Sequence, residues 1–286
     1  MNNYLAFILL SILLAGCGHL QDRHATALGI ADSGNLIPGS LATGQFRLTI
    51  FHRGLDQKST ALAVYIEGDG YAWKRKNLLS DDPTPIDPVA LKLAAKDLSS
   101  SVLYIARPCQ YLSPEELKNC DPKYWSTHRF AEEVIRAVNT AVDWGARKSG
   151  TAKVYLYGYS GGGAVAALVA ARRTDVARLT TIAANLDQVL WTTELGLAPL
   201  SGSLNPADAT DKLQDIPQVH FAGSEDKIVP VNILEAYRAR FGDNANIILR
   251  IIPGFDHHCC WADSWPNLLL KPNPDSATRQ IPENRQ

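Results

Sequence analysis

Ser160 lies at the centre of a Gly-x-Ser-x-Gly pattern that it forms with Gly158 and Gly162. A hydrophobic run, residues 154–157, precedes the pattern, and a run of alanines and valines follows it. This order is typical of a strand, a very tight turn with strained backbone at the serine, and a helix. The positions two before and two after the serine come too close to carry side chains, so both are glycine. The turn exposes the hydroxyl as a nucleophile, and the N–H groups that begin the helix face any negative charge formed beside it.

A carboxylate and an imidazole follow in two later segments. Asp226 comes after a hydrophobic run and a turn of small residues, and it is followed by Ile-Val-Pro. His257 comes after the last hydrophobic run, in the spacing Gly-x-x-His. An aspartate that accepts a hydrogen bond from a histidine fixes its tautomer, and that histidine can take the proton of a serine. Glu225 and His258, each one position away, are the alternatives in these segments.

These three segments resemble the nucleophile turn, the acid turn and the histidine loop of the α/β-hydrolase superfamily, in the chain order Ser, Asp, His found there. The resemblance spans most of the chain and implies a catalytic triad of Ser160, Asp226 and His257, an acyl-enzyme intermediate and no cofactor. The substrate implied is a small-molecule ester or another acyl compound. We expect a carboxylesterase. A peptidase or thioesterase with the same triad, and a non-catalytic binding or envelope lipoprotein, are the alternatives because this fold hosts many functions.

The same resemblance implies an oxyanion hole after an early strand, here residues 61–66. The family commonly has a His-Gly pattern there, and Glu67 stands in place of the histidine. Because backbone N–H groups form the hole, this replacement need not disable it. We expect the N–H of Asp69, with Gly70 as the next choice, and the N–H of Gly161 as the second donor. A plain glycine-rich turn with a surface aspartate is the alternative.

The elements that must position these residues alternate along the chain. The predicted strands are 46–51, 61–66, 102–106, 154–157, 179–184, 219–222 and 247–252. The predicted helices are 87–96, one that starts at a cap on Ser126 or Thr127 and runs through Val142, one that follows Ser160, and 230–241. Continuous apolar strands between helices indicate a mostly parallel central sheet with helices on both faces, which is an α/β fold.

One connection, residues 186–208, is longer than usual and carries Trp191 with several glycines and prolines. A connection of this length could lie over the active site, and an irregular surface excursion is the alternative. Trp191, Trp125 and Trp261 are candidates for lining a substrate site, or else for anchoring the core.

The N-terminus predicts export. Residues 1–15 are almost entirely apolar and lead into Leu14-Ala15-Gly16-Cys17, which resembles the lipobox of bacterial lipoproteins. The resemblance implies a signal peptide over 1–16, cleavage before Cys17, acylation of Cys17, and a membrane anchor. Gly18 in place of an aspartate favours the outer membrane, facing the periplasm. An ordinary secretory signal is the alternative. The hydrolase domain is then 17–270, and 271–286 is a polar tail with three prolines.

Export changes how the other four cysteines are interpreted. In an oxidising compartment an even number of cysteines favours disulfides. We expect a Cys109–Cys120 bridge, which closes a short loop, and leave Cys259 and Cys260 as either a vicinal disulfide or two thiols. Crossed pairing between the two sets is the other possibility.

Composition limits the remaining functions. The chain has 286 residues and 46% hydrophobic content, enough for a full core. Lys and Arg number 28 against 29 Asp and Glu, with no basic run, so nucleic-acid binding has no support. No His and Cys spacing matches a zinc site, and we expect no metal.

Overall fold

The structure, a computed structural model, describes residues 22–243 and 245–270. The signal peptide over 1–16, the lipidation site Cys17 and the tail 271–286 lie outside the described residues, so these remain predictions. Within the described part, no helix is both long and apolar enough to cross a membrane.

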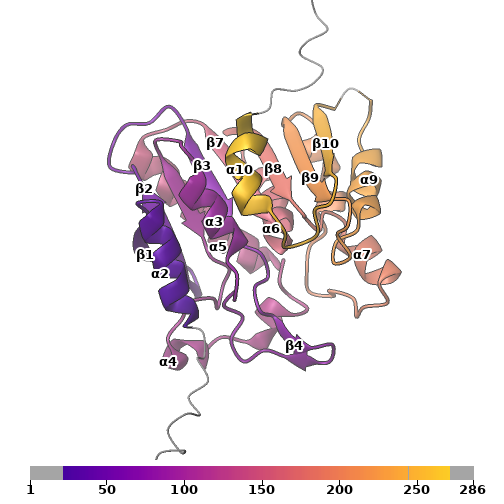
Figure 1. Cartoon of the computed structure of the whole chain (residues 1–286), viewed down its shortest axis with the longest axis horizontal. Coiled ribbons are helices and arrows are strands. Elements are labelled where there is room, and N and C mark those ends of the chain that lie inside the picture. Colours follow the sequence, from indigo (N-terminus) through magenta and orange to yellow (C-terminus); the bar gives the residue numbers. More distant parts are fainter. Residues whose placement is uncertain (1–21, 244, 271–286) are drawn as a thin grey trace, which may run out of the picture.

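An eight-stranded sheet forms the centre of the molecule (Figure 1), in the order β1-β2-β6-β3-β7-β8-β9-β10. The first two strands are antiparallel to each other, β2 is antiparallel to β6, and the remaining pairs are parallel. The expected α/β fold with a mostly parallel sheet is confirmed. The strands are β1 (Ile37–Thr43), β2 (Phe46–Arg53), β3 (Leu62–Ile66), β6 (Val102–Ile105), β7 (Val154–Tyr159), β8 (Val176–Ile182), β9 (Gln218–Gly223) and β10 (Ile247–Ile252).

Helices cover both faces of this sheet. One face packs against α2 (Arg23–Ser33), α3 (Val89–Lys96) and α10 (Trp261–Leu270). The other packs against α5 (Glu132–Ser149), α6 (Gly161–Ala170) and α9 (Val231–Ala239). Each face therefore has its own hydrophobic core. Shorter elements lie in the connections: the hairpin β4 (Trp73–Arg75) and β5 (Leu78–Leu79), the helices α4 (Pro114–Leu117), α7 (Gln188–Glu194) and α8 (Thr210–Leu213), and 3₁₀ turns at Pro122–Trp125 and Pro206–Asp208.

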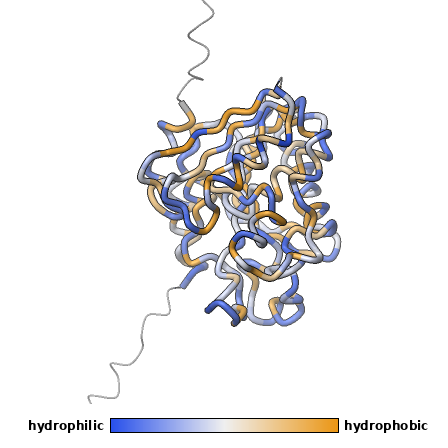
Figure 2. The backbone as a smooth tube through the Cα atoms, turned by 90° about the vertical axis from the view of Figure 1, so that its right-hand side faces the viewer, coloured by the Kyte–Doolittle hydropathy of each residue, from blue (hydrophilic) through white to orange (hydrophobic). Residues whose placement is uncertain are grey.

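The hydrophobic pattern explains this layering. Strands β3 and β6 are buried at every position because they lie in the middle of a sheet covered on both sides. Helix α6 is buried all round, whereas α5 buries one stripe that includes Val134, Val138 and Val142. Figure 2 shows hydrophobic stretches gathered in the body of the molecule and hydrophilic residues in many of the turns at its edge.

One predicted helix start was wrong. Helix α5 begins at Glu132, with Ala131 at its N-cap, rather than at a cap on Ser126 or Thr127. The segment before it is not helical, and the carbonyl of Thr127 instead accepts hydrogen bonds from Gly202 N and Ser203 Oγ. Glu132 and Glu133 in the first turn, and Arg147 and Lys148 in the last, complement the helix dipole.

Candidate active site

Ser160 occupies the turn between β7 and α6 in strained backbone, with φ 51° and ψ −126°. Its N–H donates to the carbonyl of Ile182 on the neighbouring strand at 2.9 Å. A Cβ on Gly158 would lie 2.3 Å from Gly162 O, and a Cβ on Gly162 would lie 2.3 Å from Ile66 O. Both positions must therefore be glycine, for the steric reason that the sequence predicted.

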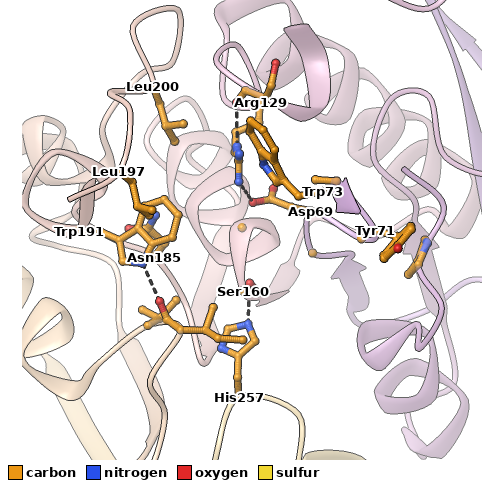
Figure 3. Close-up of a pocket in the computed structure, with 18 of the residues that line it drawn as sticks. Asp69, Tyr71, Trp73, Arg129, Ser160, Asn185, Trp191, Leu197, Leu200 and His257 are labelled. Carbon is orange, nitrogen blue, oxygen red and sulfur yellow. Dashed lines mark hydrogen bonds and ion pairs between the residues drawn. The ribbon is translucent and has the colours of Figure 1, made fainter. Parts of the chain in front are cut away.

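Asp226 and His257 lie beside this serine, in the loops that follow β9 and β10. His257 Nε2 lies 3.0 Å from Ser160 Oγ (Figure 3), and His257 Nδ1 lies 2.8 Å from Asp226 Oδ2. Asp226 Oδ1 accepts hydrogen bonds from the backbone N–H groups of Ile228 and Val229, both at 2.8 Å. The structure therefore joins the three residues in one hydrogen-bonded chain, with the aspartate held from behind by two amides.

The neighbouring candidates lie elsewhere. The side chains of Glu225 and His258 are exposed, whereas Asp226 and His257 are each only 5% exposed. His258 Nδ1 lies 3.5 Å from the hydroxyl of Tyr159, and its backbone N–H donates to Asp256. Of the two adjacent acids and the two adjacent histidines, the geometry thus brings only Asp226 and His257 to the serine.

The histidine loop is anchored through its backbone. The carbonyl of His257 accepts a hydrogen bond from the hydroxyl of Tyr159 at 2.8 Å and another from Trp261 Nε1 at 3.2 Å. Tyr159 immediately precedes the serine, and Trp261 begins α10. The imidazole is therefore held from both the nucleophile turn and the C-terminal helix.

The residues proposed for the oxyanion hole line the cavity next to the serine. Among the described residues, no group accepts a hydrogen bond from the backbone N–H of Asp69, Gly70 or Gly161. A Cβ on Gly70 would lie 2.1 Å from Pro83 O, so its glycine is needed for a close backbone approach. The roles of Asp69 and Gly161 as donors stay a proposal, and these amides are available for it.

Asp69 has a second set of contacts that the sequence did not predict. Its carboxylate pairs with Arg107 Nη1 at 3.1 Å and with Arg129 Nη1 at 2.6 Å. Burial alone would raise the pKa of the Asp69 carboxyl, but the two guanidinium groups together hold that pKa below its ordinary value. Asp69 is therefore an ionised carboxylate between two cations, rather than a surface aspartate.

Glu67, immediately after β3, is buried beneath the same turn. Its carboxylate accepts hydrogen bonds from the N–H groups of Gly68, Ala90 and Leu91 and from the hydroxyl of Tyr104. Burial raises the pKa of Glu67 to about 7, although these hydrogen bonds act in the opposite direction. The side chain ties the turn after β3 to the start of α3.

A cavity of about 990 Å³ opens beside Ser160. The hairpin β4–β5 supplies Trp73 to its wall, and the long connection 186–208 supplies Trp191 and Leu197. That connection, which the sequence left as either a cover or a surface excursion, lines the site. Trp125 and Trp261 belong to the core instead, where their indole N–H groups donate to backbone carbonyls.

The structure pairs the four described cysteines as Cys109–Cys120 and Cys259–Cys260. Crossed pairing between the two sets is not present among them. The first bridge closes a loop that packs on Trp125, and the second lies between His258 and the start of α10.

Comparisons with known proteins bear on the fold. Searches with protein-family models and among curated proteins found no match. Est1E from Butyrivibrio proteoclasticus with ferulic acid bound is similar in structure, with a TM-score of 0.59 and 14% identity over 81% of this chain and 98% of that one. A serine hydrolase homologue from Coxiella burnetii is similar with a TM-score of 0.52 and 13% identity, over 81% of this chain and 92% of that one. Pyrococcus horikoshii acylaminoacyl peptidase is similar with a TM-score of 0.57 and 11% identity, over 78% of this chain and 38% of that one.

The sheet order and these similarities define the class: the chain has the α/β-hydrolase fold. Within that fold, the hydrogen-bonded Ser160, His257 and Asp226 lie at the carboxyl ends of the parallel strands, beside the cavity.

Proposed function

We propose that this protein is a serine hydrolase that cleaves carboxylic esters. The observation that supports this most directly is the chain of hydrogen bonds from Asp226 through His257 to Ser160, at 2.8 and 3.0 Å, at the wall of a cavity. A serine with that partner is activated as a nucleophile, and an unused pair of amides lies next to it.

The mechanism follows from these positions. His257 Nε2 takes the proton of Ser160 while Oγ attacks the ester carbonyl, and the oxyanion is stabilised by the N–H groups of Gly161 and Asp69. His257 then gives the proton to the leaving alcohol, and the acyl group stays on Ser160. Water then attacks the acyl carbon while His257 takes one of its protons, and His257 returns that proton to Ser160 Oγ as the bond from Oγ to the acyl carbon breaks and the acid leaves. Asp226 keeps the Nδ1–H of the imidazole in place throughout.

The shape of the cavity supports a small-molecule substrate. Trp73, Ile86, Leu197 and Ile228 line it and remain partly exposed, so a hydrophobic group can be buried among them. Among structures with this fold, a Pyrococcus furiosus protein is described as an esterase, and Est1E is described with ferulic acid bound. The same triad could also hydrolyse peptide amides, so activity must be compared on ester bonds and on amide bonds.

A fluorophosphonate probe and a series of p-nitrophenyl esters of graded acyl length test this proposal. The wild-type protein should be labelled at Ser160 and should hydrolyse some of the esters, whereas Ser160→Ala should lose both properties. A matched series of peptide p-nitroanilides should react far more slowly. Labelling that persists in Ser160→Ala, or turnover of the anilides alone, would contradict the assignment.

We further propose that the protein is exported and anchored through lipid on Cys17. The lipobox residues support this, and two disulfides suit an oxidising compartment. The expected location is the outer membrane, facing the periplasm. Metabolic labelling with a clickable fatty acid should mark the wild-type protein, and Cys17→Ser should remove the label and release the protein from membranes. A retained label would contradict the proposal.

A further inference from the structure

Two buried arginines share a single carboxylate beside the nucleophile turn. The side chains of Arg107 and Arg129 are 4% and 8% exposed, and both pair with Asp69. Arg107 also donates through Nη2 to the backbone carbonyl of Arg129, which ties its side chain to the segment that carries Arg129. Figure 3 shows the Arg129–Asp69 pair on the opposite side of Ser160 from His257.

The charges of this cluster do not cancel. Asp69 contributes one negative charge and the two guanidinium groups contribute two positive charges, so one positive charge remains. The other acids that line the cavity, Asp87 and Glu67, form no ion pair with either arginine: Asp87 pairs with Lys92, and Glu67 accepts hydrogen bonds from Tyr104 and the start of α3. A buried excess charge is unfavourable unless an anion neutralises it.

The hydrogen-bond donors of Arg129 are also not all used. Its Nε donates to the carbonyl of Ser126 at 2.8 Å, and Nη1 donates to Asp69. Among the described residues nothing accepts a hydrogen bond from Nη2, although the side chain is more than nine-tenths buried and lines the cavity. A guanidinium with free N–H groups at a cavity wall is suited to a planar carboxylate.

We propose that Arg129 is the centre of a carboxylate-binding subsite, and that the substrate is an ester carrying a free carboxylate in its acyl or its alcohol part. The inference rests on the proposed ester hydrolysis at Ser160. The carboxylate would accept hydrogen bonds from Arg129, while the hydrophobic part of the substrate packs on Trp73 and Leu197. Arg107 has a positioning role, because it holds Asp69 and the backbone of Arg129.

Matched pairs of esters test this subsite. For the acyl part, p-nitrophenyl hydrogen adipate is compared with p-nitrophenyl methyl adipate. For the alcohol part, the butyrate ester of 3-(4-hydroxyphenyl)propionate is compared with that of its methyl ester. In at least one pair, kcat/KM of the wild-type enzyme should favour the anionic ester by about tenfold or more, the range expected of one hydrogen bond to a charged group. The pair that shows the preference tells which part carries the carboxylate.

Three variants distinguish a specific effect of Arg129 from a general effect of positive charge at the cavity. Arg129→Gln should abolish the preference mainly through KM of the anionic ester, and Arg129→Lys should restore part of it. Lys76→Gln, which removes a positive charge from an exposed position on the same cavity, should keep the preference. Loss of the preference in Lys76→Gln and its retention in Arg129→Gln would overturn the proposal.

The outcomes also distinguish this inference from the proposed function. Turnover of the neutral esters that disappears in Ser160→Ala supports ester hydrolysis by itself, and equal kcat/KM within both pairs would then refute only the subsite. Calorimetric titration of Ser160→Ala with each ester measures binding without chemistry, and the anionic ester should bind more tightly. If the Arg129 variants fail to fold, the comparison of ester pairs on the wild-type enzyme and this titration still test whether the carboxylate subsite exists.

Discussion

The carboxylate of Asp69 lies directly against Gly161: a Cβ placed on Gly161 would be 2.2 Å from Asp69 Oδ1. The two residues proposed to supply the oxyanion hole therefore touch each other. The contact explains why the residue after the nucleophile carries no side chain, and it makes the position of Asp69 dependent on that absence. Arg107 pairs with Oδ1 of the same carboxylate and Arg129 pairs with Oδ2.

Gly161→Ala tests this contact. The new methyl group must displace the Asp69 carboxylate, and with it the adjacent N–H, so we expect kcat/KM to fall by about 10²–10³, the range seen when one oxyanion donor is lost. Ester kinetics and thermal unfolding measure the two effects separately.

Gly29→Ala is the matched control for that substitution. Gly29 lies in helix α2, and nothing lies within 4 Å of the Cβ that it would acquire. Alanine is the better helix former by about 1 kcal/mol, so this variant should keep full activity and unfold at an equal or slightly higher temperature. Full activity in Gly161→Ala would show that Asp69 does not need its present position.

The two adjacent histidines should behave very differently. We expect His257→Ala to lower kcat by on the order of 10⁴-fold or more, because the serine then has no base. His258→Ala should stay within a few-fold of wild type, since its exposed ring lies 3.5 Å from Tyr159 rather than beside the serine. Steady-state kinetics on one ester decides between them, and the opposite ranking would move the base to His258.

Glu67 should make stability depend on pH. Its pKa is raised from 4.5 to about 7 in the folded protein. Below pH 4.5 the carboxyl is protonated in both states. Between pH 4.5 and 7 only the unfolded state loses its proton, so the free energy of unfolding decreases as pH rises, by about 3 kcal/mol in total. Above pH 7 this contribution is constant.

Urea unfolding of Glu67→Gln across this range measures the effect. The variant lacks the titrating group, so its stability relative to wild type should rise by that amount between pH 4.5 and 7, whatever constant offset the lost hydrogen bonds cause. Glu115→Gln, at an exposed position, should run parallel to wild type. Parallel curves for Glu67→Gln and wild type would contradict the prediction.

The two disulfides should differ in their effect on stability. Replacing Cys109 and Cys120 together by alanine opens a loop with a sequence separation of 11 and should lower the free energy of unfolding by about 3 kcal/mol. Replacing Cys259 and Cys260 in the same way opens no loop of consequence and is the control. Equal losses would show that packing, rather than loop closure, stabilises this part of the protein.

The sequence predicted the residues around Ser160 because each follows a strand whose pattern is local. Strand β10 has the predicted bounds, and Ser160, Asp226 and His257, which follow β7, β9 and β10, come to one edge of a parallel sheet. The structure separates Glu225 and His258 from the serine, a distinction that hydrophobic periodicity could not make because a shift of one position in a loop leaves no periodic signal.

The Arg129–Asp69 pair could not be predicted in this way. The two residues are 60 positions apart, and neither lies in a helix or strand whose pattern would orient it. Helix α10 was also missed, since Pro266 interrupts its sequence. The spacing of Trp261 and Trp265, four residues apart and both fully buried, was a usable signal for a helix with one apolar face.

Helix α10 determines how late in synthesis the histidine loop can be fully anchored. Its Trp265 donates a hydrogen bond to the hydroxyl of Tyr65, 200 residues earlier, and its Trp261 holds the carbonyl of His257. The strands that carry the serine are made long before these tryptophans. A nascent chain that has not yet reached α10 can form much of the sheet, yet its histidine loop lacks one of its anchors. If the proposed hydrolysis holds, it should therefore begin only after α10 has been made.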